Sequence, residues 1–565
     1  MNYLDFIVLG ATLVLIVLVG VWQIKKQHSI QSFLLGDKSM RWGTIGLSVM
    51  ATQASAITFI STPGQAYESG LSFVQNYFGL PFAMIIVSAV FIPIYYKLKV
   101  YTAYEYLESR FDIKTRMLGA FLFLVQRGLA AGITIYAPAI ILSSILGWNL
   151  NATILITGIS VIIYTVTGGT TAVSTTQKYQ MAIIMVGMFA AFFIAINYIT
   201  QHVPLGDAMD LASSLGKLNA IDLDLNFEKR YTLWSGLAGG LFLALSYFGT
   251  DQSQVQRYLA GKNITASRMG LMFNAIFKVP MQFFILFTGV LVYIFYVFYQ
   301  PPVHFKEVSM EMLRQSPAKE QLLVYESEYE ELVNQRKEIA LEISAAENGS
   351  SERATLLDDF KSVDLKSIEV RNKVKNLINE VSPETETKDS DYVFLTFVMN
   401  YLPNGLIGLL IAVILSAAMS STSSELNALA STSAIDIYRR LVKKDATDRQ
   451  YLFMSRVLTL FWGGVALSFA IMATNTENLI EAINIVGSIF YGTILGIFII
   501  AFLIKYVKGN AVFYAALIAQ CVVFAVHFMI MAGYFSLGYL WYNVIGFTAT
   551  IVISLIIQTL MPKSK

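Results

Sequence analysis

Long apolar stretches recur along almost the whole chain and predict membrane-spanning helices. A helix needs about 20 mostly apolar residues to cross the hydrocarbon core of a bilayer. Stretches of this kind fall at residues 4–24, 43–70, 73–96, 116–146, 150–167, 176–200, 232–256, 269–299, 400–430, 451–474, 479–504, 510–533 and 538–561. The pattern predicts an all-α polytopic membrane protein with about 13 transmembrane helices.

One polar segment, residues 303–392, interrupts this pattern and carries 20 Asp or Glu and 12 Lys or Arg residues. Its apolar residues recur at spacings of three and four, which predicts a hairpin of two helices at about 317–346 and 353–380. The segment divides the chain into transmembrane helices 1–8 (residues 1–302), a charged insertion, and transmembrane helices 9–13 (residues 393–565). Runs of charged residues usually form solvated faces, so we expect the insertion to be a solvated decoration. The alternative is that it docks an external partner or captures a substrate.

Composition narrows the class of protein further. The chain has 565 residues, 55% of them hydrophobic and 14% charged, whereas soluble domains average about 25% charged residues. This excludes a soluble enzyme and a disordered protein, and the net charge of +2 gives no argument for a nucleic-acid partner. The sequence has no phosphate-binding glycine loop, no nucleophile–base pair and no metal-ligand spacing, so we expect no enzyme. The expected partners are the lipid bilayer and a small solute.

The basic residues of the short loops predict the orientation in the membrane. Each loop rich in Lys and Arg follows an odd-numbered span, and examples are Lys25, Lys26, Arg439, Arg440, Lys563 and Lys565. Because such loops face the cytoplasm, the N-terminus is expected outside, the C-terminus in the cytoplasm and the insertion outside. The expected location is the cell (inner) membrane.

The second span is too polar for an ordinary lipid-facing helix. Small and hydroxyl residues dominate residues 47–64, and the pair Pro63 and Gly64 ends this stretch. Small residues permit close packing of helices, which is one interpretation. The other is a helix broken near the middle of the membrane, because a break frees carbonyl oxygens that can coordinate a cation.

The ninth span contains five consecutive hydroxyl residues, Ser420 to Ser424, followed by Glu425. Ala417, Ser420, Ser421 and Ser424 fall on one face of a helix. Hydroxyl and carbonyl oxygens suit a monovalent cation that is bound and released in each cycle. Bonding of the hydroxyls to their own helix is the alternative. Further polar residues at membrane depth are Arg127, Gln177, Asp251 and Asn484.

Four segments together resemble the sodium:solute symporter family, namely 51–70, 97–112, 255–258 and 420–438. The pattern is most similar to bacterial sialic acid and sodium–glucose type symporters. Residues 135–139 look like the monocarboxylate, multivitamin and iodide branch. The resemblance implies a LeuT-type fold of two inverted five-helix repeats, which begin at about 43 and 232.

The resemblance also implies Na⁺ as the coupled ion. By motif position, its ligands are the backbone carbonyls of Ala51, Ala54 and Ala417 and the hydroxyls of Ser420 and Ser421. Family members with a second sodium site carry an aspartate where this chain has Gln177. The serine half of that site, Ser423 and Ser424, is present, and Glu425 is the other nearby carboxylate. Because adjacent helix positions point about 100° apart, we expect Glu425 to face away from these serines.

Family positions for the substrate fall on Gln53, Ser55, Ala56, Thr58, Phe73, Tyr77 and Asn484. The arginine that pairs with the substrate carboxylate in sialic acid symporters falls at Ala130, and Arg127 lies one turn away. Asp251 is a further candidate in the seventh span. The implied function is sodium-coupled import of a small polar organic solute, such as a sugar or sialic acid, by alternating access. A monocarboxylate or vitamin-type anion symporter is the alternative, and a transporter-derived sensor is a third interpretation.

Overall fold

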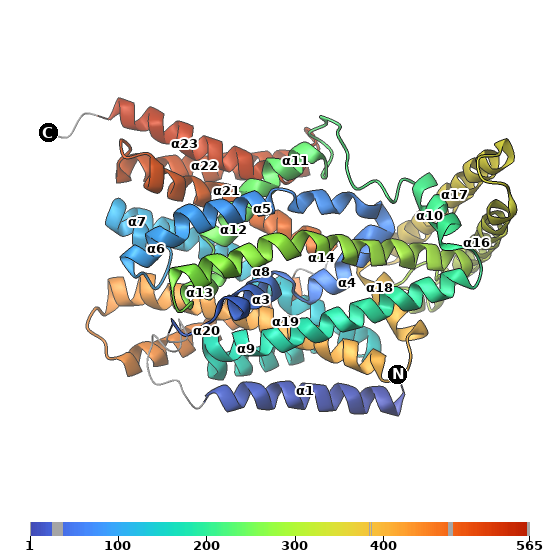
Figure 1. Ribbon diagram of the computed structural model, residues 1–565, viewed down its shortest axis with the longest axis horizontal. Helices are drawn as coiled ribbons and strands as arrows, with labels where there is room; N and C mark the ends of the chain where they lie inside the picture. Colours follow the sequence, from blue (N-terminus) through green and yellow to red (C-terminus); the bar gives the residue numbers. More distant parts are fainter. Residues whose placement is uncertain (1, 25–37, 384, 386, 473–477, 562–565) are drawn as a thin grey trace.

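The computed structural model describes residues 2–24, 38–383, 385, 387–472 and 478–561 (Figure 1). Among these residues, nine helices are long and apolar enough to cross a membrane, and a tenth span results if one bent pair is counted. The predicted all-α polytopic class is confirmed. The count of 13 spans and the placement of the termini stay predictions. Lys25, Lys26, Lys563 and Lys565, which entered the orientation argument, lie outside the described residues.

The long helices lie side by side in one bundle, because their apolar surfaces pack against one another (Figure 1). These are α1 (Tyr3–Ile24), α8 (Ile113–Leu146), α9 (Leu150–Thr200), α14 (Ile264–Phe298), α19 (Leu406–Thr432), α20 (Asp448–Met472), α21 (Leu479–Leu503), α22 (Gly509–Met531) and α23 (Trp541–Leu560). The third predicted span is segmented into η2 (Gly70–Tyr77), α5 (Leu80–Ile86), η3 (Val87–Phe91) and α6 (Ile92–Leu98).

The second predicted span is two helices, α3 (Trp42–Gln53) and α4 (Ala56–Ser69). The chain leaves the helical conformation at Ala54 (φ −91°, ψ 72°) and Ser55 (φ −74°, ψ 179°). Carbonyls in the last turn of a helix have no partner within that helix, so the break exposes backbone oxygens inside the bundle. Pro63 lies within α4 and does not mark the break.

The seventh predicted span is also broken. It consists of α11 (Leu233–Leu237), α12 (Gly239–Gly249) and α13 (Gln252–Leu259), and it bends by 57° between α12 and α13. Asp251 lies at this bend, where its side chain accepts a hydrogen bond from the Ser253 amide and caps α13. The two broken spans are each the first span of one predicted repeat.

Residues 150–167 and 176–200, predicted as two separate spans, belong to the single element α9. A straight helix of its 51 residues would be about 77 Å long. Both ends nevertheless lie at the same side of the bundle. Asn149 and Asn400 line one cavity, and the Tyr198 ring packs on the Tyr401 ring at 6.0 Å. The chain of α9 therefore folds back and passes through the bundle twice.

The charged insertion forms two long helices, α16 (Lys319–Ala345) and α17 (Ser351–Val381), which project from one end of the bundle (Figure 1). They pack on each other through a small core of their own that includes Leu322, Val333 and Val374. Short helices α10 (Leu205–Ser214), α15 (Glu307–Arg314) and α18 (Ser390–Tyr401) connect the hairpin to the bundle. Arg353 of α17 fixes it to α10 through ion pairs of 2.7 Å with Asp207 and Asp210.

Candidate functional site

A cavity lies inside the bundle where the breaks in α3/α4 and α12/α13 meet α8, α19 and α21. The cavity volume open to the centre of a water-sized sphere is about 80 Å³. Its polar lining consists of Thr52, Gln53, Ser55, Asn76, Tyr77, Gln126, Arg127, Thr134, Tyr247, Glu425, Asn484 and Tyr491. Its apolar lining includes Leu80, Leu243, Ala244, Phe248, Ile480 and Ile483.

Five of the residues predicted to contact substrate line this cavity: Gln53, Ser55, Tyr77, Arg127 and Asn484. The others do not. Ala56 is fully buried, and the Thr58 hydroxyl donates to the Gln53 carbonyl at 3.5 Å. The buried Phe73 ring packs on the rings of Tyr77 and Tyr231. Asp251 lies behind the lining and is bonded to Arg127 and Tyr491.

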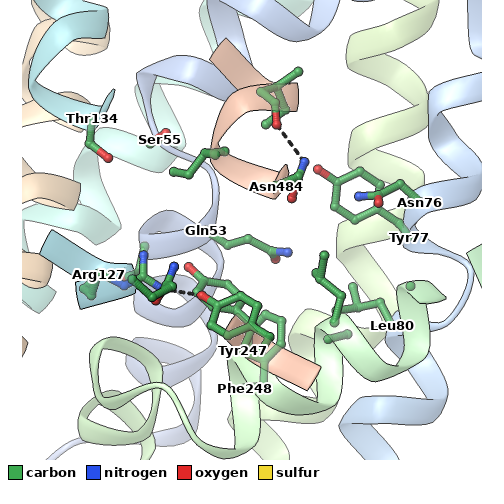
Figure 2. Close-up of a pocket in the computed structure, with 18 of the residues that line it drawn as sticks. Gln53, Ser55, Asn76, Tyr77, Leu80, Arg127, Thr134, Tyr247, Phe248 and Asn484 are labelled. Atoms are coloured by element: carbon green, nitrogen blue, oxygen red, sulfur yellow. Dashed lines mark hydrogen bonds between the residues drawn. The ribbon is translucent and has the colours of Figure 1, made fainter. Parts of the chain in front are cut away.

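Gln53 projects from the end of α3 into the middle of the cavity, with Asn484, Tyr77 and Leu80 around it (Figure 2). Its Oε1 atom is buried and has no hydrogen-bond partner among the described residues. Asn484 already donates from Nδ2 to the Ile480 carbonyl at 2.8 Å. A buried acceptor without a partner is costly, so Gln53 Oε1 has the capacity to accept a further hydrogen bond.

Arg127 of α8 lies at one wall of the cavity between two carboxylates. Its Nη1 donates to Glu425 Oε1 at 3.0 Å, and its Nη2 donates to the Tyr491 hydroxyl at 2.7 Å and to Asp251 Oδ2. Arg127, Asp251 and Glu425 are all buried. The guanidinium also lies over the Tyr247 ring, 5.3 Å from its centroid. Arg127, the arginine predicted as a partner for a substrate carboxylate, is therefore already paired with Asp251 and Glu425 of the protein itself.

The serine-rich part of α19 faces the break in the second span. The Ser421 hydroxyl donates to the Ala51 carbonyl at 3.5 Å, the outer limit of a hydrogen bond. The Ser420 hydroxyl is buried and has no partner among the described residues. Ala54 and Ala417 are buried as well. The structure thus brings hydroxyls and freed carbonyls together from elements far apart in the sequence.

Gln177 of α9 joins α3 and α19 beside this cluster. Its Nε2 donates to Thr52 Oγ1 at 3.2 Å and to Ser424 Oγ at 3.3 Å, while its Oε1 accepts from the Ser48 hydroxyl at 2.7 Å. The neighbouring Ser423 is buried. The carboxylate of Glu425 is bonded to Arg127 on the cavity side. The Gln177 amide nitrogen therefore donates to the hydroxyls of both Thr52 and Ser424.

Polar contacts close the bundle on both sides of the cavity. On one side, Arg116 pairs with Glu108 at 2.8 Å and with Asp436 at 2.7 Å. On the other side, Asp391 of α18 accepts hydrogen bonds from Asn478 Nδ2 at 3.0 Å and from the Leu479 amide at 3.3 Å. These contacts tie α18 to the start of α21. Separate layers on either side of a central site are what alternating access requires.

Stability is expected to depend on pH through Asp391. Burial raises the pKa of the Asp391 carboxyl from 3.8 to about 7. Between these two values the native protein holds a proton that the unfolded chain has released, so this stabilising contribution is lost as the pH rises. We expect the melting temperature of the wild type to fall more steeply from pH 4 to pH 7 than that of Asp391→Asn.

Thermal unfolding in detergent across this pH range measures the difference. Asp222→Asn is the matched control, because Asp222 lies in the loop before α11 and its pKa is lowered by the Asp224 amide and Lys229. Equal slopes for the wild type and Asp391→Asn would exclude the titration of Asp391 as the cause.

A helical bundle with a polar cavity at two broken helices is an architecture of membrane transporters. The chain belongs to the sodium:solute symporter family, whose model matches residues 33–311 and 377–519. The unmatched stretch between these ranges contains α16 and most of α17.

Relatives and a solved structure agree with this assignment. The chain is 26% identical over 508 residues to sodium-coupled monocarboxylate transporter 1 of Xenopus laevis, and this alignment covers 89% of this chain and 68% of the relative. It is 26% identical over 501 residues to the sodium-dependent multivitamin transporter of Oryctolagus cuniculus, and this alignment covers 88% of this chain and 66% of the relative. A Na⁺-coupled sialic acid symporter, solved in a substrate-bound outward-open state, shares the fold with a TM-score of 0.74 at 22% identity, covering 100% of this chain and 99% of that chain.

Two predictions are confirmed by these findings, namely the family and Na⁺ as the co-transported ion. The protein is a multi-pass membrane transporter of this family, and its relatives are transporters as well. Sequence reasoning missed several lining residues, among them Asn76, Thr134, Tyr247 and Tyr491. Tyrosines and small polar residues are frequent along the chain, and no local signal distinguishes those that face the cavity.

Proposed function

We propose that the protein is a sodium-coupled symporter of the cell (inner) membrane that imports a small polar organic solute by alternating access. The observation that carries this proposal is the location of the serine-rich face of α19 against the break between α3 and α4. The hydroxyl of Ser421 meets the carbonyl of Ala51 there, and Gln53, two residues further along, points into the cavity.

The proposed sodium ligands are the carbonyls of Ala51, Ala54 and Ala417 and the hydroxyls of Ser420 and Ser421. Five neutral oxygens suit an ion that must leave again in each cycle. Sodium bound there would hold the end of α3 against α19, and α3 carries Gln53. Ordering of the break by sodium would therefore place Gln53 for substrate, which couples the two binding events.

We propose one sodium per solute. A second monovalent cation beside Ser423 and Ser424 would need an anionic ligand to offset its charge in the interior. Gln177 places a hydrogen-donating amide between Thr52 and Ser424 instead. Glu425 supplies no replacement there, since its carboxylate pairs with Arg127.

Replacing Gln177 with aspartate is expected to create a second sodium site. The carboxylate would accept a cation where the Gln177 amide now donates to Thr52 and Ser424. The Hill coefficient for sodium-dependent uptake should rise from near one to clearly above one. Gln180→Asp is the control, because Gln180 lies on the same helix and donates to the Ser416 carbonyl at 3.2 Å. A wild-type coefficient already above one would overturn the single-sodium stoichiometry.

The solute is proposed to be a sugar, sialic acid or related compound, because several neutral polar groups line the cavity. The names of the monocarboxylate and multivitamin relatives favour a second candidate, an organic anion. Uptake into proteoliposomes tests the function itself. Accumulation above the external concentration must require an inward sodium gradient, and equilibration without a gradient would indicate a passive pathway.

The external insertion is proposed to present a solvated surface to the outside, with a docking partner as the other candidate role. Its own apolar core and its ion pairs to α10 account for how it is held. The charged faces of α16 and α17 that remain exposed are available to solvent or to a partner.

A further inference from the structure

We propose that the solute carries a protonated amine that binds Glu425, and that the cavity rejects simple carboxylates. This inference rests on the proposed function, because it names the chemical class of the solute that the central cavity binds. It follows from the charge and the hydrogen-bonding state of the groups that line one wall.

Both Nη atoms of Arg127 already have partners in this wall, whereas its Nε is buried and has none among the described residues. Arg127 uses Nη1 for Glu425 and Nη2 for Tyr491 and Asp251. A carboxylate ligand could bind the two Nη atoms only by displacing acids that are themselves buried. Displacement would leave an uncompensated buried carboxylate, which is strongly unfavourable.

The negative charge in the same wall is only partly satisfied. Glu425 Oε1 accepts from Arg127, while Oε2 is buried without a hydrogen bond of ordinary geometry, and the Thr134 hydroxyl lies beside the carboxylate. One guanidinium faces two carboxylates, so the cluster of Arg127, Asp251 and Glu425 has an excess of one negative charge. An ammonium group donates up to three hydrogen bonds and carries the compensating charge.

No other charged side chain lines the cavity among the described residues. A further buried cation, Lys278 of α14, lies beside the lining: its Nζ is over the Tyr77 ring, 5.5 Å from the centroid, and has no hydrogen-bond partner among the described residues. Lys278 itself is outside the lining. The charged side chains of the lining are therefore Arg127 and Glu425, and Asp251 behind them gives the cluster its excess negative charge.

The rest of the cavity fits the remainder of such a solute. Gln53 Oε1, Asn76 Oδ1 and Gln126 Oε1 are buried acceptors without partners among the described residues, and they suit hydroxyl or amide donors. Leu80, Leu243 and Ile483 offer an apolar surface for a carbon skeleton. Amides can donate or accept, whereas the carboxylate can only accept, so Glu425 decides the preferred head group.

The experiment compares head groups on fixed skeletons. The melting temperature of the purified full-length protein is measured with and without sodium. Three sets of compounds are added, each with an amine, a hydroxyl or a carboxylate on the same skeleton: propylamine, propanol and propionate; glucosamine, glucose and glucuronate; benzylamine, benzyl alcohol and benzoate. The expected result is that an amine gives the largest sodium-dependent rise in melting temperature within a set. In Glu425→Gln its affinity should fall about 30-fold, while the matching alcohol changes little.

Glu481→Gln is the control, because this buried carboxylate pairs with Arg230 at 2.6 Å outside the cavity. It should keep the wild-type ranking of head groups. The ranking in the wild type is decisive even where Glu425→Gln does not fold. Three results would overturn the proposal. A carboxylate or an alcohol stabilises the wild type best, no amine stabilises it, or the preference for amines survives in Glu425→Gln.

The failure of this inference can be distinguished from the failure of the proposed function. Sodium alone should raise the melting temperature of the wild type if the sodium site is correct. A sodium effect combined with a preference for carboxylates would reject only the amine. The absence of any sodium effect would reject the symporter site itself.

Discussion

Replacing Ser420 and Ser421 together with alanine is expected to abolish sodium-stimulated uptake while the protein stays folded. The change removes two of the five proposed ligands and leaves the carbonyls of the break without their partners on α19. Each lost polar contact in a buried site costs about 1–3 kcal/mol, so the affinity for sodium should fall by about 100-fold or more. The measurement is uptake as a function of sodium concentration, together with the rise in melting temperature that sodium causes.

Ser416→Ala combined with Ser431→Ala is the matched control. These two serines lie on the same helix, but their hydroxyls donate to carbonyls of that helix, Ala412 at 2.7 Å and Asn427 at 2.6 Å. Their loss should leave the sodium dependence unchanged. If the Ser420 and Ser421 variant keeps the sodium dependence of the wild type, the sodium site has been assigned to the wrong residues.

Replacing Asp251 with leucine is expected to destabilise the protein by about 3–5 kcal/mol, because it breaks a buried ion pair and leaves Arg127 Nη2 without its carboxylate acceptor. The cap of α13 is lost at the same time. Arg127→Leu should cost a similar amount, since it leaves two carboxylates facing each other. Thermal and denaturant unfolding in detergent measure both losses.

The double variant with leucine at both positions provides the sharper test. It removes both charges, so it should be less destabilised than the sum of the two single variants. Lys229→Ala gives the reference for an exposed pair, because its bond to Asp222 at 2.9 Å is solvent-exposed and should contribute little to stability. Simple additivity of Arg127→Leu and Asp251→Leu would show that the two side chains act independently.

The coupling proposed here depends on short distances along the chain at the break. Ala51 faces the serines of α19, and Gln53 faces the cavity, with a single residue between them. On this proposal, a change at the ion site would reach Gln53 through about one turn of backbone. The weakness of the helix at Ala54 and Ser55 makes this segment responsive, because the hydrogen bonds of a regular helix are missing there.

The insertion adds a constraint at one end of the same broken span. Lys375 of α17 lies 3.9 Å from Glu68 near the end of α4, and the buried Lys217 donates to the Tyr67 carbonyl at 2.7 Å. Burial lowers the pKa of the Lys217 ammonium to about 8. The end of α4 is thus held by groups from α17 and from the loop after α10, while its other end forms the break.

The sequence by itself determined the class of protein, most of the spans and the polar positions. The length of an apolar stretch and the period of a helix are local properties, so they can be read without the fold. The predicted insertion helices at 317–346 and 353–380 differ from α16 and α17 by one or two residues at each end. The hydroxyl run at Ser420 to Ser424 and the polar second span also stood out locally.

Only the tertiary structure decided how these positions meet. Arg127 lies 124 residues from Asp251 and 298 residues from Glu425 along the chain. Gln177 lies 125 residues from Thr52 and 247 residues from Ser424. The position of the break at Ala54 and Ser55 was likewise set by packing. The period of a helix tells which side chains share a face, but it does not tell which face of another helix lies opposite. That pairing depends on how the whole bundle packs, because Arg127 and Gln177 find their partners on other helices.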